Sequence, residues 1–274
     1  MKLEVRKLAI FCGIMLCLTL TTEAAKYRKG KFLIGIAAGT ASYHGDLAQK
    51  YFNVNSSGPM AGIFTRFSMS PYFDWRNQIS FGQIKADDAN SEFYKARNLN
   101  FKSNIYEFAS TFEFNFLPYG INKTNNEFYF SPYVFLGLGA FYYDPIATYN
   151  GEDIGLHDLK TENVNYNLIQ PNVPFGMGIK FAWTDRFEVG FEVGYRRLFT
   201  DYLDDVSGKY PSFSQLENDQ GLASAQASHA QTYNGALPAE PNSMRGDNHI
   251  TDSYLFGNVT FSYRFYYKDP CRSI

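Results

Sequence analysis

The last apolar stretch of the chain constrains the fold more than any other feature, because its side chains alternate in character from one residue to the next. Every second residue over positions 255–267 is apolar, aromatic or glycine, and the positions between them include Asn258, Thr260, Ser262 and Arg264. A period of two is typical of a β-strand whose two faces meet different surroundings. The segment is therefore predicted to be a strand with one face in lipid and the other in a polar lumen.

Seven further stretches show the same alternation, and the connections between the stretches are alternately long and short. This double pattern is typical of outer-membrane barrels, in which short turns face the periplasm and long loops face outward. Eight strands close a small barrel without a free edge. The sequence therefore predicts an all-β fold, an eight-stranded antiparallel transmembrane β-barrel with long external loops and short periplasmic turns. Its strands are expected at residues 31–43, 59–69, 73–85, 99–117, 128–143, 173–183, 186–202 and 252–267.

The first residues have the character of an export signal. Lys2, Arg6 and Lys7 accompany an apolar run over residues 8–20, and small residues stand near position 24. This run is too short to cross a bilayer as a helix, which needs about 20 apolar residues. We therefore expect residues 1–24 to be a cleaved signal peptide and residues 25–274 to form the barrel domain. That organisation predicts a location in the outer membrane of a Gram-negative bacterium.

The composition fits a barrel and gives no reason to expect a nucleic-acid partner. Hydrophobic residues make up 45% of the chain, yet the mean hydropathy is −0.30. A barrel explains both values, because its strands expose apolar side chains to lipid at only every second position. The formal net charge is −2, so the chain lacks the strong basic bias of a nucleic-acid-binding protein.

The predicted inward face carries both signs of charge in nearly equal number. An ion buried without a partner would be very costly, so these side chains are expected to pair across the narrow interior of an eight-stranded barrel. We therefore predict a lumen filled by ion pairs that conducts almost nothing. The predicted network consists of Arg66, Arg76, Glu107, Glu113, Lys180, Glu188, Glu192, Arg196 and Arg264.

The opposite face is rich in Phe, Ile, Leu and Val and is predicted to form the lipid-facing band. Aromatic rings at the strand ends are expected at the level of the lipid headgroups. The expected girdle residues include Phe73, Trp75, Phe116, Tyr119, Tyr142, Trp183 and Tyr267.

The longest predicted connection spans residues 203–251. Its portion at residues 212–234 is rich in Ser, Ala, Gln, Asn and Gly and has few large apolar residues. Such a composition supplies little material for a core. We therefore expect this portion to be poorly ordered unless a partner holds it.

No residue pattern predicts catalysis. Clustered glutamates such as those of the inward face can act as acid/base pairs, but the basic residues on the same face favour ion pairing. His44, His157 and His249 lie in predicted loops, and no Ser stands in a G-x-S-x-G setting. We predict no catalytic residue, no cofactor-binding residue and no small-molecule substrate.

Three carboxylates, Asp201, Asp204 and Asp205, stand at the outer end of the seventh predicted strand. Bunched oxygen ligands can bind Ca²⁺, although the spacing differs from that of an EF-hand loop and favours a hydrogen-bonded turn. Both interpretations stay open, and no metal ligand is assigned. Cys271 is the only cysteine outside the predicted signal, so an intramolecular disulfide in the mature chain is excluded.

Several peptides resemble those of one known family. They are YHGDL at residues 43–47, RNLNF at 97–101, EFNFLPY at 113–119, PFGMGIK at 174–180 and TDYLDDVS at 200–207. Together they resemble the PorG family, outer-membrane barrels of the type IX protein secretion system of Bacteroidota. The resemblance implies a non-enzymatic accessory protein of the secretion and gliding machinery that contacts the periplasmic ring of PorK and PorN. It brings no catalytic or cofactor residue.

A periplasmic partner reaches only the short-turn end of the predicted barrel. The basic residues near the amino terminus are equally suited to an acidic protein and to lipid phosphates, so the expected partners are ring proteins and outer-membrane lipid. The alternative function is a small surface barrel that acts through its external loops as an adhesin or minor pore, and a third is a lipid-modifying enzyme. The candidate contacts are Lys26, Arg28, Lys29, Asn122, Lys123, Asn125 and Cys271.

Overall fold

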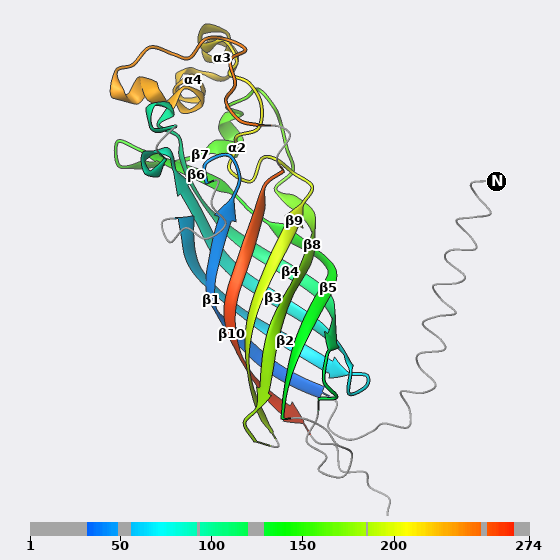
Figure 1. The fold of residues 1–274 in the computed structure, drawn as a ribbon. Helices are drawn as coiled ribbons and strands as arrows, with labels where there is room; N and C mark the ends of the chain where they lie inside the picture. Colours follow the sequence, from blue (N-terminus) through cyan, green and yellow to red (C-terminus); the bar gives the residue numbers. More distant parts are fainter. Residues whose placement is uncertain are drawn as a thin grey trace, which may run out of the picture.

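Eight long strands form a closed barrel (Figure 1). The computed structural model describes residues 32–48, 56–91, 94–119, 129–184, 186–247 and 251–265. Neighbouring strands are antiparallel in the order β3-β2-β1-β10-β9-β8-β5-β4, and β3 also pairs with β4, which closes the ring. The barrel strands are β1 (Phe32–His44), β2 (Ser57–Ser68), β3 (Phe73–Asp87), β4 (Asn100–Asn115), β5 (Phe130–Tyr142), β8 (Ile169–Ala182), β9 (Phe187–Leu198) and β10 (Ser253–Phe265).

The predicted fold class and all eight predicted strands are confirmed. The largest differences are at β8, which begins four residues earlier than expected, and at β9, which ends at Leu198 rather than at position 202. Strand β9 ends where its pairing ends, because its last partners are Ser253 of β10, opposite Arg197, and Asn172 of β8, opposite Leu198. Beyond this point the chain has no ladder to continue the strand.

The outer wall of the barrel is apolar. Along β4 the side chains are alternately buried and exposed, as the period of two requires. The large exposed side chains on the wall include Leu136, Leu138 and Met177. A closed barrel leaves no unpaired backbone edge, and a wall of this size and apolarity is stable in contact with hydrocarbon. The protein is therefore a β-barrel of the outer membrane.

The long loops at one end fold into a compact structure that we call the cap (Figure 1). Strand β6 (Pro145–Tyr149) pairs with β4 beyond the barrel wall, and β7 (Glu152–Gly155) pairs with β6. The helices of the cap are α2 (Leu156–Leu159), α3 (Phe213–Gln220) and α4 (Leu222–Ser228), with 3-10 helices η2 (Asp88–Asn90), η3 (Lys95–Arg97) and η4 (Ala230–Asn234). No helix in the described residues is both long and apolar enough to span a membrane.

The expectation of poor order over residues 212–234 is wrong. This portion contains α3, α4 and η4, and the side chains of Leu216, Ala225, Ala227 and Ala230 are buried. The Tyr233 ring stacks on Tyr149 of β6, with 4.4 Å between ring centroids. Small residues bury completely when helices approach closely, so a tract with few large apolar residues still forms a packed layer here.

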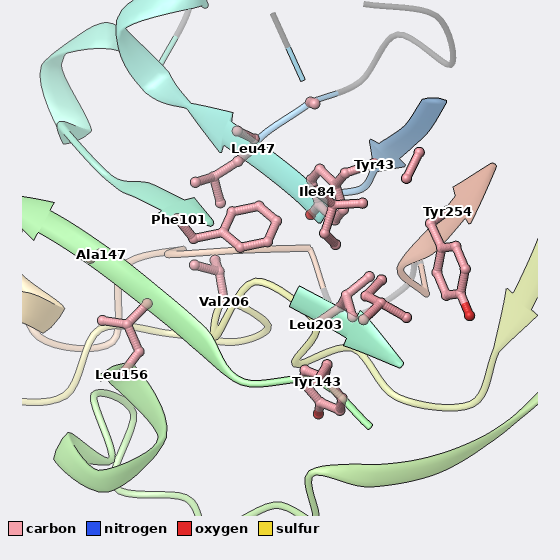
Figure 2. Close-up of a cluster of buried hydrophobic side chains, with 14 of the residues drawn as sticks. Tyr43, Leu47, Ile84, Phe101, Tyr143, Ala147, Leu156, Leu203, Val206 and Tyr254 are labelled. Atoms are coloured by element: carbon pink, nitrogen blue, oxygen red, sulfur yellow. The ribbon is translucent and has the colours of Figure 1, made fainter. Parts of the chain in front are cut away.

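The hydrophobic core lies at the cap end of the barrel and continues into the cap. Figure 2 shows Ile84 and Phe101 from the barrel strands beside Leu203 and Val206 from the loop after β9. Leu156 of α2 belongs to the same cluster. The barrel end and the cap therefore share one core, while the rest of the lumen is lined mainly by charged and polar side chains with aromatic rings between them.

Candidate functional site

All nine predicted lumen residues point into the barrel and are buried. The structure adds one acidic residue that the sequence analysis missed, Asp74 of β3, which is also buried. With it, the described lumen contains five cations and five anions and is electrically balanced. The cations are Arg66, Arg76, Lys180, Arg196 and Arg264, and the anions are Asp74, Glu107, Glu113, Glu188 and Glu192.

Glu113 of β4 is the centre of the network, because three cations contact its carboxylate. Arg66 Nε lies 3.1 Å from Oε2, Arg76 Nε lies 3.3 Å from Oε1, and Lys180 Nζ lies 2.9 Å from Oε2. Arg66 and Arg76 stand directly opposite each other on β2 and β3. Like charges in that arrangement repel, so the carboxylate of Glu113 offsets a repulsion that the strand register imposes.

Each of the three cations around Glu113 also contacts a second carboxylate. Arg76 Nη1 lies 2.5 Å from Glu192 Oε2, and Lys180 Nζ lies 2.5 Å from Asp74 Oδ2. Arg66 pairs with Glu188, whose other oxygen lies 3.5 Å from Arg264 Nη2. The charges therefore form one connected network from β2 across the lumen to β9 and β10.

A separate pair lies closer to the cap. Arg196 Nε and Nη2 each lie 3.2 Å from an oxygen of Glu107. The hydroxyl of Tyr254 donates to Glu107 Oε2 at 2.6 Å, and Asn172 Nδ2 donates to the same oxygen at 2.8 Å. The Arg196 guanidinium also lies 4.1 Å from the centroid of the Phe256 ring. Glu107 and Arg196 are thus satisfied on the border between the ionic lumen and the hydrophobic core.

An aromatic ring fills the space beside the two opposed arginines. Phe64 of β2 points inward, with its ring centroid 5.2 Å from the Arg66 guanidinium and 5.8 Å from that of Arg76. The ring fits because residue 35 on β1 is glycine, where a Cβ atom would lie 2.3 Å from Phe64 Cζ. Cation–π contact and close packing together leave the arginines desolvated and fixed.

Tyr119 covers the lumen at its short-turn end, so its predicted place in an aromatic girdle is wrong. Only 8% of the residue is exposed, and its ring lies 5.2 Å from Lys180 Nζ and 5.9 Å from the Arg264 guanidinium. Its backbone N–H donates to Pro71 O at 2.9 Å, which fixes it against the β2–β3 turn. Position within the strand pattern could not place Tyr119, because it lies beyond the end of β4. The other expected girdle residues within the described ranges are exposed, and Tyr267 lies outside those ranges.

The alternation of side chains along β3 is the sequence signal that places Asp74 in the lumen. Asp74 follows Phe73 and precedes Trp75, and Arg76, Gln78 and Ser80 continue its face of β3. The same parity that placed Arg76 inside therefore also places Asp74 inside. Asp74 is the second residue of β3, next to the short turn, and a charged side chain so near a turn is more often solvated.

Asp201, Asp204 and Asp205 point to different partners. Asp201 accepts from Ser207 Oγ at 2.7 Å, Asp204 from Val206 N at 2.9 Å, and Asp205 from the Tyr166 hydroxyl at 2.8 Å. Burial raises the pKa of Asp201 and of Asp205 to about 7. In the part of the chain that the structure describes, no group of three or more His, Cys, Asp or Glu side chains is placed to hold a metal ion. These contacts are those of a hydrogen-bonded turn.

The predicted partner contacts all lie outside the described residues. They are Lys26, Arg28, Lys29, Asn122, Lys123, Asn125 and Cys271.

The comparison with protein families assigns the chain. The family described as a domain of unknown function, DUF6089, matches residues 8–225, which is most of the sequence. The chain belongs to the DUF6089 family. The sequence of this DUF6089 protein matches no curated protein.

The DUF6089 barrel is also similar to several solved barrels. Ail, the attachment invasion locus protein of Yersinia pestis, solved in complex with the heparin analogue sucrose octasulfate, is 13% identical, with 86% of this chain and 99% of Ail covered and a TM-score of 0.41. Neisserial surface protein A is 10% identical, with 85% of this chain and 97% of that protein covered and a TM-score of 0.41. OprG from Pseudomonas aeruginosa is 9% identical, with 87% of this chain and 97% of OprG covered and a TM-score of 0.41.

Proposed function

We propose that this DUF6089 protein is a non-enzymatic outer-membrane scaffold that binds and anchors periplasmic ring components, of the PorK and PorN kind, of a type IX secretion and gliding machinery. The observation that carries the proposal is the filled lumen. Five cations and five anions contact one another there, and the hydrophobic core occupies the cap end. A barrel filled in this way offers its rims and loops as working surfaces, rather than a pore or a catalytic cleft.

The PorG resemblance supplies the identity of the partner in this proposal. Two of the peptides that carry the resemblance take structural positions that explain their composition. Glu113 and Tyr119, at the two ends of the segment EFNFLPY, are the centre of the ion network and the cover of its short-turn end. The segment TDYLDDVS forms the turn that leaves β9 and enters the core through Leu203 and Val206. These residues hold the barrel together, and the partner contacts belong to other positions on the short-turn rim.

The alternative function is a surface barrel that acts through the cap as an adhesin. The observation in its favour is that the cap is folded, with its own helices and a core continuous with the barrel. A rigid cap presents a defined binding surface, which a set of loose loops does not. The filled lumen argues against the minor pore that was considered with the adhesin.

Site-specific crosslinking separates the two functions. Photoreactive residues are placed at Asn122 and Lys123 on the short-turn side, and at the exposed cap positions Leu222 and Leu237. The scaffold proposal expects periplasmic ring proteins to be captured from positions 122 and 123 in living cells, with no such product from the cap. Capture from the cap positions alone, by a surface or host molecule, would replace the scaffold by the adhesin.

A further inference from the structure

Two carboxylates meet at one buried hydroxyl where the longest loop joins the barrel. The Tyr43 hydroxyl, near the end of β1, lies 2.5 Å from Asp204 Oδ2 and 2.9 Å from Asp252 Oδ1. Asp204 follows β9 and Asp252 immediately precedes β10. The contact therefore ties both ends of the β9–β10 connection to a third strand, and all three side chains are buried.

The two contacts at the Tyr43 hydroxyl together require one proton more than the hydroxyl itself supplies. The remaining oxygens of the two carboxylates accept backbone N–H groups, Val206 N on Asp204 and Leu203 N on Asp252. The Tyr43 hydroxyl has one proton and can donate to only one carboxylate. The second short contact needs a proton on the other carboxyl group, which then donates to the Tyr43 oxygen. One bound proton thus converts a repulsion between two anions into a chain of two hydrogen bonds.

Within the described residues, neither carboxylate forms an ion pair. Arg97 of η3 is the cation whose charge acts on Asp204, but it is already held by Asp88, with two contacts of 2.7 Å. The other charged groups that act on the pair are acidic. They are Asp46 from the segment after β1 and Asp201 from the turn after β9.

The surroundings exclude water from the pair. A Cβ atom at Gly45 would lie 2.0 Å from Asp252 Oδ1 and 2.2 Å from the Tyr43 hydroxyl, so the backbone of Gly45 covers both groups. The rings of Tyr43 and Phe101 pack edge to face, with 4.8 Å between their centroids. Both residues belong to the hydrophobic cluster drawn in Figure 2. Burial raises the pKa of Asp204 and of Asp252 well above the ordinary value, and the nearby acidic groups raise both further.

From this geometry we propose that Asp204, Tyr43 and Asp252 form a proton-dependent latch, which holds the β9–β10 connection of the cap on β1 and releases it when the surrounding medium becomes alkaline. The closed latch binds one proton between its two carboxylates. In the open state both aspartates are in water and ionise with an ordinary pKa of about 4. Opening above that pH therefore releases one proton.

The sign of the pH dependence follows from this proton. The closed state binds the proton more tightly than the open state, so a rise in pH favours opening. The equilibrium constant for opening should increase about tenfold per pH unit until the closed latch itself loses the proton. Asp46, whose pKa is raised to about 6, and Asp201 and Asp205, raised to about 7, add similar contributions at lower pH. A slope that persists above about pH 8, where those three groups are ionised in the closed state as well, therefore belongs to the latch.

Hydrogen exchange in the refolded full-length protein tests the latch. The readout is the protection factor of the Leu203 and Val206 amides, which donate to the two carboxylates, corrected for the pH dependence of intrinsic exchange. Between about pH 8 and about pH 9 the wild type should lose about tenfold protection. Asp252→Asn keeps a neutral group that can both donate to Tyr43 and accept from Leu203, so its protection should be nearly independent of pH in this window.

Two further measurements keep the test decisive. Asp153→Asn removes an exposed carboxylate of β7, in the cap, that pairs with Lys102 of β4. This control variant should lose protection with rising pH as steeply as the wild type. If Asp252→Asn does not fold, infrared spectra of the wild type should show a protonated carboxyl band at about pH 8 that disappears reversibly as protection is lost. Protection independent of pH in the wild type, an Asn variant with the wild-type slope, or no such band would each overturn the proposal.

Discussion

Replacing Glu113 by Gln should destabilise the barrel more than the loss of any exposed charge. The substitution keeps the shape of the side chain and removes the anion that Arg66, Arg76 and Lys180 share. The described lumen then carries one excess positive charge, close to the opposed arginines. Removing one partner from a buried ion pair costs about 3 to 5 kcal/mol, because the remaining charge stays buried without compensation. This corresponds to a change of more than about 100-fold in the unfolding equilibrium constant.

The assay is reversible urea unfolding of the protein refolded in lipid vesicles, followed by tryptophan fluorescence and by the heat-modified shift on a gel. Two variants accompany it. Asp153→Asn breaks a solvent-exposed pair with Lys102 and should leave the midpoint close to the wild type, because exposed pairs contribute little. Combining Glu113→Gln with Lys180→Met removes one charge of each sign. The two lumen substitutions should couple by about 0.5 to 3 kcal/mol, with the double variant more stable than the sum of the single effects predicts.

Two results would refute this reasoning. A Glu113→Gln barrel as stable as the wild type would mean that the three cations are compensated without it. Strictly additive effects of the two lumen substitutions would mean that Lys180 and Glu113 do not stabilise each other in the folded protein. The distance of 2.9 Å between Lys180 Nζ and Glu113 Oε2 would then reflect no favourable interaction.

Four further outcomes are expected. Glu188→Ala and Glu192→Ala should each cost about 3 to 5 kcal/mol, since each leaves a buried arginine short of a partner; unchanged heat-modifiability would contradict this. Purified protein should give no stable large single-channel steps in planar bilayers, and their appearance would show that the lumen is open. An epitope inserted beside Leu237, which is 86% exposed, should react with antibody on intact cells, and labelling only after permeabilisation would invert the orientation that loop length predicts. The same epitope at Ala225 should prevent correct folding, because that residue is fully buried.

The strands and the polar lumen were predictable because a barrel wall imposes a strict period of two on the sequence. Once Arg66 and Glu113 are assigned to the inward face, their charges already require partners, and lumen partners can come only from other inward positions. Which cation pairs with which anion depends on strand register and barrel closure. The sequence pattern sets neither, so the sharing of Glu113 among three cations emerges only in three dimensions.

The cap was not predictable in the same way, because its order comes from tertiary contacts rather than from periodicity. The Ala- and Ser-rich tract has little apolar material of its own, and it becomes ordered by packing on groups distant in the sequence. Ser224 donates to Leu159 O at 2.5 Å, and Asn98 donates to Ala230 O at 3.0 Å. Tyr119 was assigned to the wrong side of the wall for a related reason, since a residue beyond the end of a strand can point to either side.

The lumen is filled by ion pairs near the short turns and by a hydrophobic core at the cap end. Near the short turns the barrel is held by charges whose strength depends on every partner being present, so that end tolerates little change in its inward residues. At the cap end the barrel strands and the long loops share one hydrophobic core, in which Phe101 of β4 belongs to the same cluster as Leu203 and Val206. A perturbation of the cap therefore reaches the strand ends through packing, and the latch at Tyr43 lies at that junction. A protein that acts through its surfaces needs this coupling, because it keeps each rim in a fixed geometry while the lumen stays closed.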